Sequence, residues 1–112
     1  MKTASGLEYT ITEKGNGKKP QIGDKVVVHY TGKLTNDTVF DSSKKRGQPF
    51  TFKLGAGQVI KGWDEGIALM PKGTKGTLYI PSTMAYGAQS PTPLIPANSV
   101  LVFDVEVVDF KK

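Results

Sequence analysis

Residues 101–108 read LVFDVEVV, and this stretch shows how the fold is built. Apolar residues occupy its odd-numbered positions, whereas the even-numbered positions include Asp104 and Glu106. Successive side chains of a strand point to opposite faces, so a period of two predicts a β-strand with one buried face. That face would carry Leu101, Phe103, Val105 and Val107.

The same alternation recurs in four earlier stretches. They are residues 7–12, 25–34, 50–54 and 74–81. Gly15-Asn16-Gly17 and Thr35-Asn36-Asp37 separate or end such stretches, because Gly, Asn and Asp readily form turns. We therefore expect a sheet of about five antiparallel strands.

One stretch has helical spacing. Trp63, Ile67 and Met70 lie at positions i, i+4 and i+7, and Pro71 and Gly73 follow. This spacing predicts one short helix with a single apolar face. The predicted fold class is α+β, with a twisted antiparallel sheet of about five strands and one short α-helix that covers one face.

Length and composition point to one domain over residues 1–112, because 112 residues leave no room for a second core. Residues 1–22 would form an N-terminal strand and turn. Cysteine is absent and the net charge of +5 is spread along the chain. Without a basic face interleaved with aromatic residues, nucleic-acid binding is disfavoured but kept as an alternative. No apolar run is long enough to span a membrane.

The usual catalytic constellations are missing from the sequence. His29 is the single histidine, and strand alternation should turn it away from Tyr30. Scattered carboxylates predict no metal site, and no phosphate-binding loop follows Gly55-Ala56-Gly57. Seven aromatic residues instead come from six segments, and any one of them could simply belong to the core: Tyr30, Phe40, Phe50, Phe52, Trp63, Tyr86 and Phe103.

Trp63 argues for a site in addition to a core. It stands at the start of the only predicted helix, directly after a glycine-rich loop. A long loop without periodicity, residues 84–99, follows later in the chain and is typical of a functional segment. A concave apolar site is expected at such a place.

At these residues the chain resembles the FKBP-type peptidyl-prolyl cis-trans isomerases, the immunophilin family that binds the macrolides tacrolimus and rapamycin. The resemblance runs from about residue 23 to residue 110. It is carried by Val28-His29-Tyr30-Thr31-Gly32, Phe40-Asp41-Ser42-Ser43, Pro49-Phe50-Thr51-Phe52, Val59-Ile60-Lys61-Gly62-Trp63-Asp64-Glu65-Gly66, Ala85-Tyr86-Gly87, Ile95-Pro96 and Leu101-Val102-Phe103-Asp104-Val105-Glu106.

The resemblance implies a twisted antiparallel sheet of about five strands half-wrapped around one short α-helix, with a proline pocket between sheet and helix. Its catalytic residues would be Tyr30, Phe40, Asp41, Tyr86 and Phe103. Its substrate-binding residues would be Phe50, Val59, Ile60, Trp63, Leu94 and Ile95. The resemblance makes Trp63 the floor, where we expect it to be partly exposed, and assigns Leu94 and Ile95 to the rim. Arg46 is implied as a supporting residue that holds Asp41 together with Tyr30. The Ile60 amide and the Tyr86 hydroxyl would donate hydrogen bonds to carbonyl groups of a ligand.

The implied activity is rotation about Xaa-Pro bonds in unfolded or partly folded chains, with no cofactor, metal or covalent intermediate. The expected partners are proline-containing polypeptides and macrolide ligands, with no nucleic acid and no membrane. We expect a monomer. The first residues lack an apolar signal core, which favours a cytoplasmic location, although a domain trimmed from an exported protein would read the same way. A noncatalytic proline-binding module is the main alternative, and a protease-coupled peptide assay separates the two.

Overall fold

The computed structural model describes residues 6–15, 17–43, 47–57, 59–87 and 95–111. This part of the chain forms six strands, one α-helix and one 3-10 turn. Their bounds are β1 (Glu8–Glu13), β2 (Lys25–Leu34), β3 (Val39–Ser42), β4 (Phe50–Lys53), α1 (Lys61–Ile67), β5 (Lys75–Ile80), η1 (Ser82–Met84) and β6 (Leu101–Lys111).

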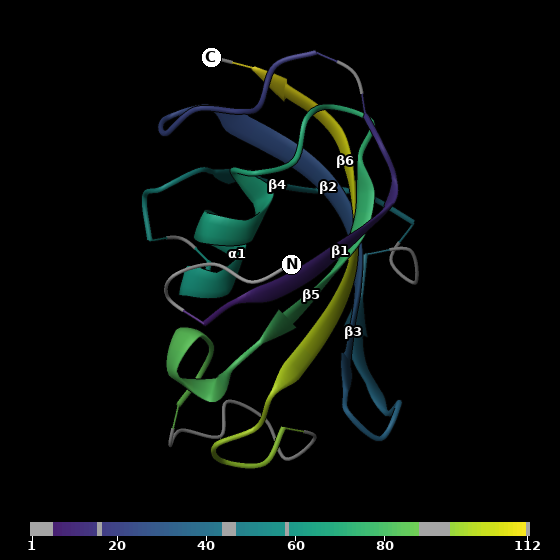
Figure 1. The fold of residues 1–112 in the computed structure, drawn as a ribbon, viewed down its shortest axis with the longest axis vertical. Coiled ribbons are helices and arrows are strands. Elements are labelled where there is room, and N and C mark those ends of the chain that lie inside the picture. The colour runs from purple at the N-terminus through teal and green to yellow at the C-terminus, as the bar shows by residue number, and fades with distance from the viewer. Residues whose placement is uncertain (1–5, 16, 44–46, 58, 88–94, 112) are drawn as a thin grey trace.

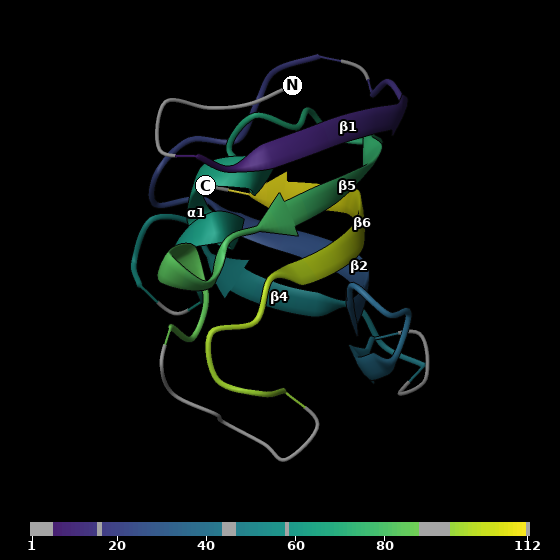
Figure 2. The ribbon, with the colours of Figure 1, turned by 60° about the horizontal axis from the view of Figure 1, so that its bottom comes forward.

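The strands form one antiparallel sheet that curves around α1 (Figures 1 and 2). Their order is β1-β5-β6-β2-β3, and β4 also pairs with β2. The two longest strands, β2 with ten residues and β6 with eleven, lie next to each other inside the sheet. The predicted α+β class is confirmed. The described residues add β3 to the five predicted strands, because four residues are too few to show alternation clearly.

The predicted inward faces are confirmed where the strands are long. Along β2, Val26, Val28 and Tyr30 are buried, while the residues between them are partly exposed. Along β6 the buried face carries the four alternating residues expected from the sequence. These inward faces and the inner side of α1 form a single core, which covers the sheet on its concave side.

Helix α1 ends earlier than the apolar spacing indicated. It stops at Ile67, and two tighter turns follow. In these turns the Leu69 amide donates to the Gly66 carbonyl at 3.1 Å, and the Met70 amide donates to the Ile67 carbonyl at 3.0 Å. These tighter turns still point Met70 into the core, where it is fully buried. The periodic pattern thus marked the buried side chains correctly but overestimated the length of the helix.

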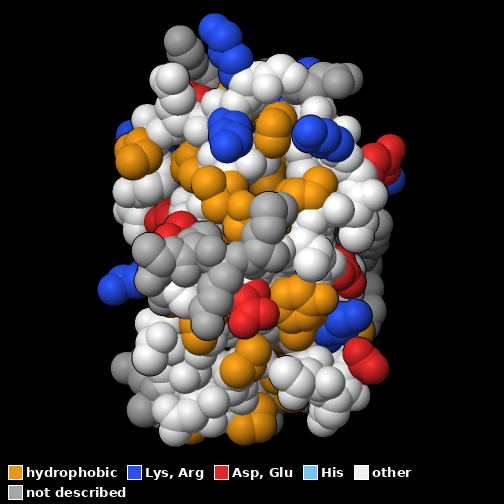
Figure 3. Space-filling view, viewed as in Figure 1, with side chains coloured by type: hydrophobic (Ala, Val, Ile, Leu, Met, Phe, Trp, Pro, Cys, Tyr) orange, Lys and Arg blue, Asp and Glu red, His pale blue; other side chains and the backbone are white. Residues whose placement is uncertain are grey.

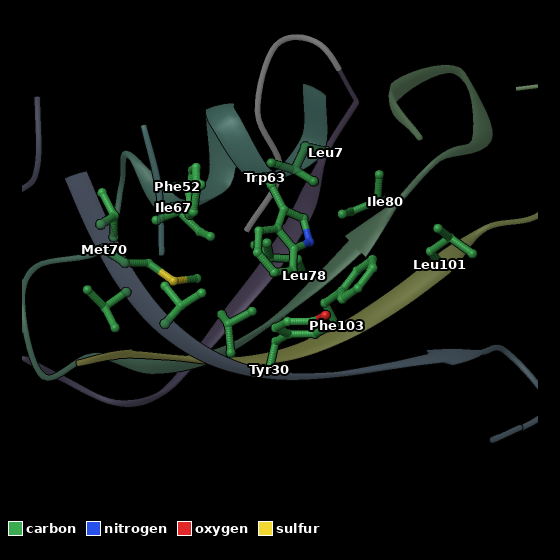
Figure 4. Close-up of a cluster of buried hydrophobic side chains, with 14 of the residues drawn as sticks. Leu7, Tyr30, Phe52, Trp63, Ile67, Met70, Leu78, Ile80, Leu101 and Phe103 are labelled. Carbon is green, nitrogen blue, oxygen red and sulfur yellow. The ribbon is translucent and has the colours of Figure 1, made fainter. Parts of the chain in front are cut away.

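A glycine lets α1 lie close against β5. A Cβ atom at Gly62 would lie 2.6 Å from Cγ2 of Ile80, a distance that real side chains do not tolerate. The absent side chain therefore allows the first turn of α1 to approach the sheet. As a result Trp63, the next residue, is held directly over the concave face (Figure 4).

The surface over this side of the molecule carries charges of both signs. Figure 3 shows basic side chains spread over the face, with acidic ones among them and apolar groups between. This agrees with a net charge of +5 that is distributed along the chain. In the described part of the protein, no helix is long and apolar enough to cross a bilayer.

Candidate active site

A cavity of about 190 Å³ opens between the start of α1 and the concave face of the sheet. Its lining comes from β2, β3, β4, β6, α1 and two connecting segments, which the fold brings together from distant parts of the chain. Nine of the residues that the resemblance assigned to a pocket line it: Tyr30, Phe40, Asp41, Phe50, Val59, Ile60, Trp63, Tyr86 and Phe103.

Trp63 forms the floor of this cavity. Its ring centroid lies 4.9 Å from that of Tyr30 and 5.2 Å from that of Phe103, with interplanar angles of 78° and 88°. Phe50 makes a third edge-on contact at 6.0 Å. Figure 4 shows the indole pointing from α1 toward Tyr30 and Phe103. Edge-to-face packing from several sides fixes the orientation of the indole ring.

The indole nitrogen is the one polar atom of this floor. Trp63 Nε1 is buried and has no hydrogen-bond partner within the described residues. A buried Trp N–H usually finds such a partner. The floor therefore presents an apolar ring to whatever enters, and it leaves one N–H donor without an acceptor among the described residues.

The wall of the cavity depends on a second glycine. Phe40 and Phe103 meet edge to face with centroids 5.6 Å apart. A Cβ atom at Gly32 would lie 2.6 Å from the Phe103 ring and 2.8 Å from the Phe40 ring. The two rings can therefore lie across β2 only because position 32 has no side chain.

One charged group lies on the wall. The Tyr30 hydroxyl donates to Asp41 Oδ2 at 2.5 Å, and Asp41 Oδ1 accepts the Ser42 amide at 2.8 Å. Burial, and secondarily the negative charge of Asp41, raises the pKa of Tyr86 above its ordinary value of 10.0. At neutral pH the Tyr86 hydroxyl is therefore a hydrogen-bond donor.

Two hydrogen-bond donors belong to residues that line the cavity, Ile60 and Tyr86. Ile60 precedes α1 in an extended conformation, and its carbonyl accepts from the amides of Trp63 (3.0 Å) and Asp64 (3.3 Å). Within the described residues, the amide of Ile60 has no acceptor and the hydroxyl of Tyr86 has none either. An apolar cavity with a few directed polar groups is typical of a small-molecule or peptide site.

Three further residues were predicted for the site. Arg46 and Leu94 are outside the described residues. Ile95 was expected at the rim, but it is 3% exposed and packs in the core. Its apolar side chain is more stable there than at the rim, because the core shields it from water more completely. No three His, Cys, Asp or Glu side chains of the described part are grouped so that they could hold a metal ion.

His29 and Ser43 complete the surroundings of Tyr30. His29 lies on the opposite face of β2, as expected, and lines a groove away from the cavity. Its Nδ1 atom is 3.0 Å from the hydroxyl of Ser43, which also accepts the Tyr30 amide. The sequence motif contained Ser43, but nothing in the pattern distinguished it from Ser42 beside it.

Known proteins resemble this chain over nearly its whole length. The family model described as FKBP-type peptidyl-prolyl cis-trans isomerase matches residues 16–108. FK506-binding protein 1 of Dictyostelium discoideum is 57% identical over 106 residues, which are 95% of this chain and 99% of that protein. The FKBP-type peptidyl-prolyl cis-trans isomerase FkpA of Aeromonas hydrophila is 53% identical, but the match covers 98% of this chain and only 40% of FkpA.

Solved structures share the fold. The crystal structure of AtFKBP13 superimposes with a TM-score of 0.91 at 43% identity, and the match covers 99% of this chain and 97% of that one. The crystal structure of FkpA from Escherichia coli gives a TM-score of 0.90 at 45% identity, with 99% of this chain and 51% of that chain covered.

Proposed function

The chain belongs to the FKBP-type peptidyl-prolyl cis-trans isomerases, and from this premise we propose that the cavity over Trp63 is where it binds and rotates Xaa-Pro bonds. The family supplies the activity, and the cavity is the location that we propose for it. The observation that carries the proposal is that nine residues from seven segments of the chain line one small, mostly aromatic hollow with Trp63 as its floor.

The size of the cavity suits a single ring. At about 190 Å³ it is smaller than the ~300–1,000 Å³ typical of sites for drug-sized ligands. A prolyl ring would stand on the Trp63 indole, between the walls of Tyr30, Phe50 and Phe103. The rest of a peptide, or of a macrolide such as tacrolimus or rapamycin, would lie outside over the rim.

The reaction needs a weakened amide resonance. Rotation about a peptide bond is opposed by a barrier of ~18–20 kcal/mol, because nitrogen donates electron density into the carbonyl group. Water stabilises this charge-separated form, so an apolar enclosure of Trp63, Phe50 and Phe103 lowers the barrier. A thousandfold acceleration requires about 4 kcal/mol of differential stabilisation of the twisted state.

Two donors would orient the substrate during that rotation. Ile60 and Tyr86 line the cavity, and the Ile60 amide and the Tyr86 hydroxyl would hold neighbouring carbonyl groups of the peptide. Asp41, held by Tyr30, would lie beside the twisting bond with its charge directed by two hydrogen bonds. None of these groups has to transfer a proton or form a covalent bond.

A titration with tacrolimus tests this assignment. Trp63 is the only tryptophan, so any change of indole fluorescence has one source. We expect the macrolide to change Trp63 emission and to inhibit the isomerase in a protease-coupled peptide assay with the same midpoint. Inhibition without any change in emission or in calorimetric heat at high ligand concentration would contradict binding over Trp63.

Two further predictions remain to be tested separately. We propose that the domain works as a monomer, which sedimentation equilibrium checks. A cytoplasmic location stays a prediction, and cell fractionation with an antibody to the protein checks it.

A further inference from the structure

On one of its two sides, strand β2 pairs with β4 along its first half and with β3 along its second half. It pairs with β4 from Lys25 to Val28 and with β3 from Thr31 to Lys33. Two residues, His29 and Tyr30, lie at the change between the two neighbours. Tyr30 is also the pocket residue that contacts both of those strands, because its ring meets Phe50 of β4 and its hydroxyl reaches Asp41 of β3.

Ser43 makes hydrogen bonds with the Tyr30 backbone at this change of partner strand. The β2–β3 register pairs Thr31 with Ser42, so the following residue, Ser43, lies opposite Tyr30. The Ser43 amide donates to the Tyr30 carbonyl at 3.0 Å. In return, the Tyr30 amide donates to the Ser43 side-chain oxygen at 2.8 Å. A side chain thus extends the ladder by one step beyond the last residue of β3.

The hydroxyl of Ser43 is enclosed by protein. The residue is 0% exposed, so water does not replace a hydrogen bond that is lost there. Ser43 holds the backbone of Tyr30 at both its amide and its carbonyl group. Asp41, two residues earlier on the same segment, holds the Tyr30 hydroxyl. One short segment therefore fixes Tyr30 at both ends.

We propose that Ser43 is a positioning residue for isomerisation, acting through Tyr30. It sets the place of the Tyr30 ring against the Trp63 floor, at 4.9 Å and 78°, and with it the hydroxyl that orients Asp41. This role rests on the proposed location of the active site, although Ser43 itself does not line the cavity.

The hydrogen bond from the Tyr30 amide to the Ser43 hydroxyl can form with either tautomer of the neighbouring His29 imidazole. The Ser43 hydroxyl has one proton, which it can donate to His29 Nδ1 at 3.0 Å or to the Tyr30 carbonyl at 3.4 Å. When Nδ1 carries a proton it donates to Ser43, and the hydroxyl turns to the carbonyl. Both arrangements leave an acceptor lone pair for the Tyr30 amide, so Ser43 works as a fixed support.

Ser42 provides a matched control. It is the adjacent serine of the same segment and is also buried, but its hydroxyl lies 3.2 Å from Thr31 Oγ1, whereas the Tyr30 amide donates to Ser43. Ser43→Ala and Ser42→Ala therefore each delete one buried hydroxyl. Only the first deletes the acceptor of the Tyr30 amide.

The experiment measures kcat/KM with a proline peptide and amide hydrogen exchange by NMR, well below the unfolding temperature of each variant. For Ser43→Ala we expect a loss of about five- to tenfold in kcat/KM, which is the size of one buried hydrogen bond. The loss should be carried by kcat, and the Tyr30 amide should exchange faster. Ser42→Ala should keep kcat/KM within about twofold and leave Tyr30 exchange unchanged.

Equal efficiencies of folded Ser43→Ala and wild type would overturn the proposal, and so would an equal loss in Ser42→Ala. If Ser43→Ala does not fold, Ser43→Cys decides, because its thiol has a similar shape but is a weak acceptor. Unchanged kcat/KM in that variant overturns the role. Asp41→Ala distinguishes failure of the Ser43 role from failure of the proposed active site. If it loses activity while Ser43→Ala does not, only the role of Ser43 fails. If both retain full activity, the proposed site fails as well.

Discussion

Trp63 and Phe103 meet edge to face, with ring centroids 5.2 Å apart and an interplanar angle of 88°. Each residue is 4% exposed. The sequence led us to expect a partly exposed Trp63, and that expectation is wrong. The floor of the cavity is at the same time part of the hydrophobic core, so changes at the floor should affect folding as well as activity.

Truncation of either ring should therefore destabilise the protein strongly. We expect Trp63→Ala and Phe103→Ala each to lower the free energy of unfolding by about 3–5 kcal/mol, the usual cost of deleting a buried aromatic side chain. Urea denaturation followed by circular dichroism measures this. Tyr79→Ala, an exposed residue of β5, serves as the control and should cost less than about 1 kcal/mol. A similarly small cost for Trp63→Ala would contradict the buried floor.

Loss of the Tyr30 hydroxyl should reduce catalysis more than stability. Tyr30→Phe keeps the ring on Trp63 but removes the 2.5 Å hydrogen bond that orients Asp41. We expect kcat/KM to fall about tenfold, as for the loss of one charge-assisted hydrogen bond. Tyr79→Phe, which removes a hydroxyl from the other face of the sheet, should retain wild-type efficiency. Full activity in Tyr30→Phe would show that Asp41 needs no such support.

Much of the fold was predictable from alternation. The inward faces of β2, β5 and β6 were read correctly, because each strand is long enough to repeat its pattern several times. Strand β3 was missed, since its four residues, Val39–Ser42, end in two polar positions. The end of α1 was missed because Met70 stays buried after the helix has changed into tighter turns.

The site was predictable from the resemblance to a greater extent than from physical patterns. The seven aromatic residues marked a possible pocket, but alternation alone could not separate Phe50, which lines the cavity, from Phe52, which is core. Two features depend on the three-dimensional register and leave no trace in the sequence. One is the pairing of Ser43 with Tyr30, and the other is the inward turn of Ile95.

Activity should be almost independent of pH from about pH 6 to 9. The proposed mechanism moves no proton, whereas general acid–base catalysis gives a bell-shaped profile. His29, the single histidine, lies on the opposite face of β2 from the cavity. We expect kcat/KM to vary by less than about twofold over this range, and His29→Gln to behave like the wild type. A bell centred near neutrality would instead indicate proton transfer.

Strongly alkaline conditions should reveal Tyr86. Burial and the charge of Asp41 raise the pKa of Tyr86 above 10.0, so the folded state keeps this proton to a higher pH than the unfolded state does. The free energy of unfolding should therefore fall as pH rises past about 10 and through the raised pKa. Tyr86→Phe removes this contribution, so its stability should fall less steeply between pH 9 and 11. Identical slopes in urea titrations of the two proteins would contradict the raised pKa.

If prolyl peptides bind on the Trp63 indole, the indole N–H resonance of Trp63 must respond to them. This resonance is unique in the protein, and its donor has no partner within the described residues. We predict that a proline-containing peptide shifts it saturably in ¹H–¹⁵N spectra, and that the same peptide with alanine in place of proline does not. The midpoint should equal the concentration at which the peptide competes in the isomerase assay. A peptide that competes fully in that assay while the Trp63 resonance stays in place would contradict the account.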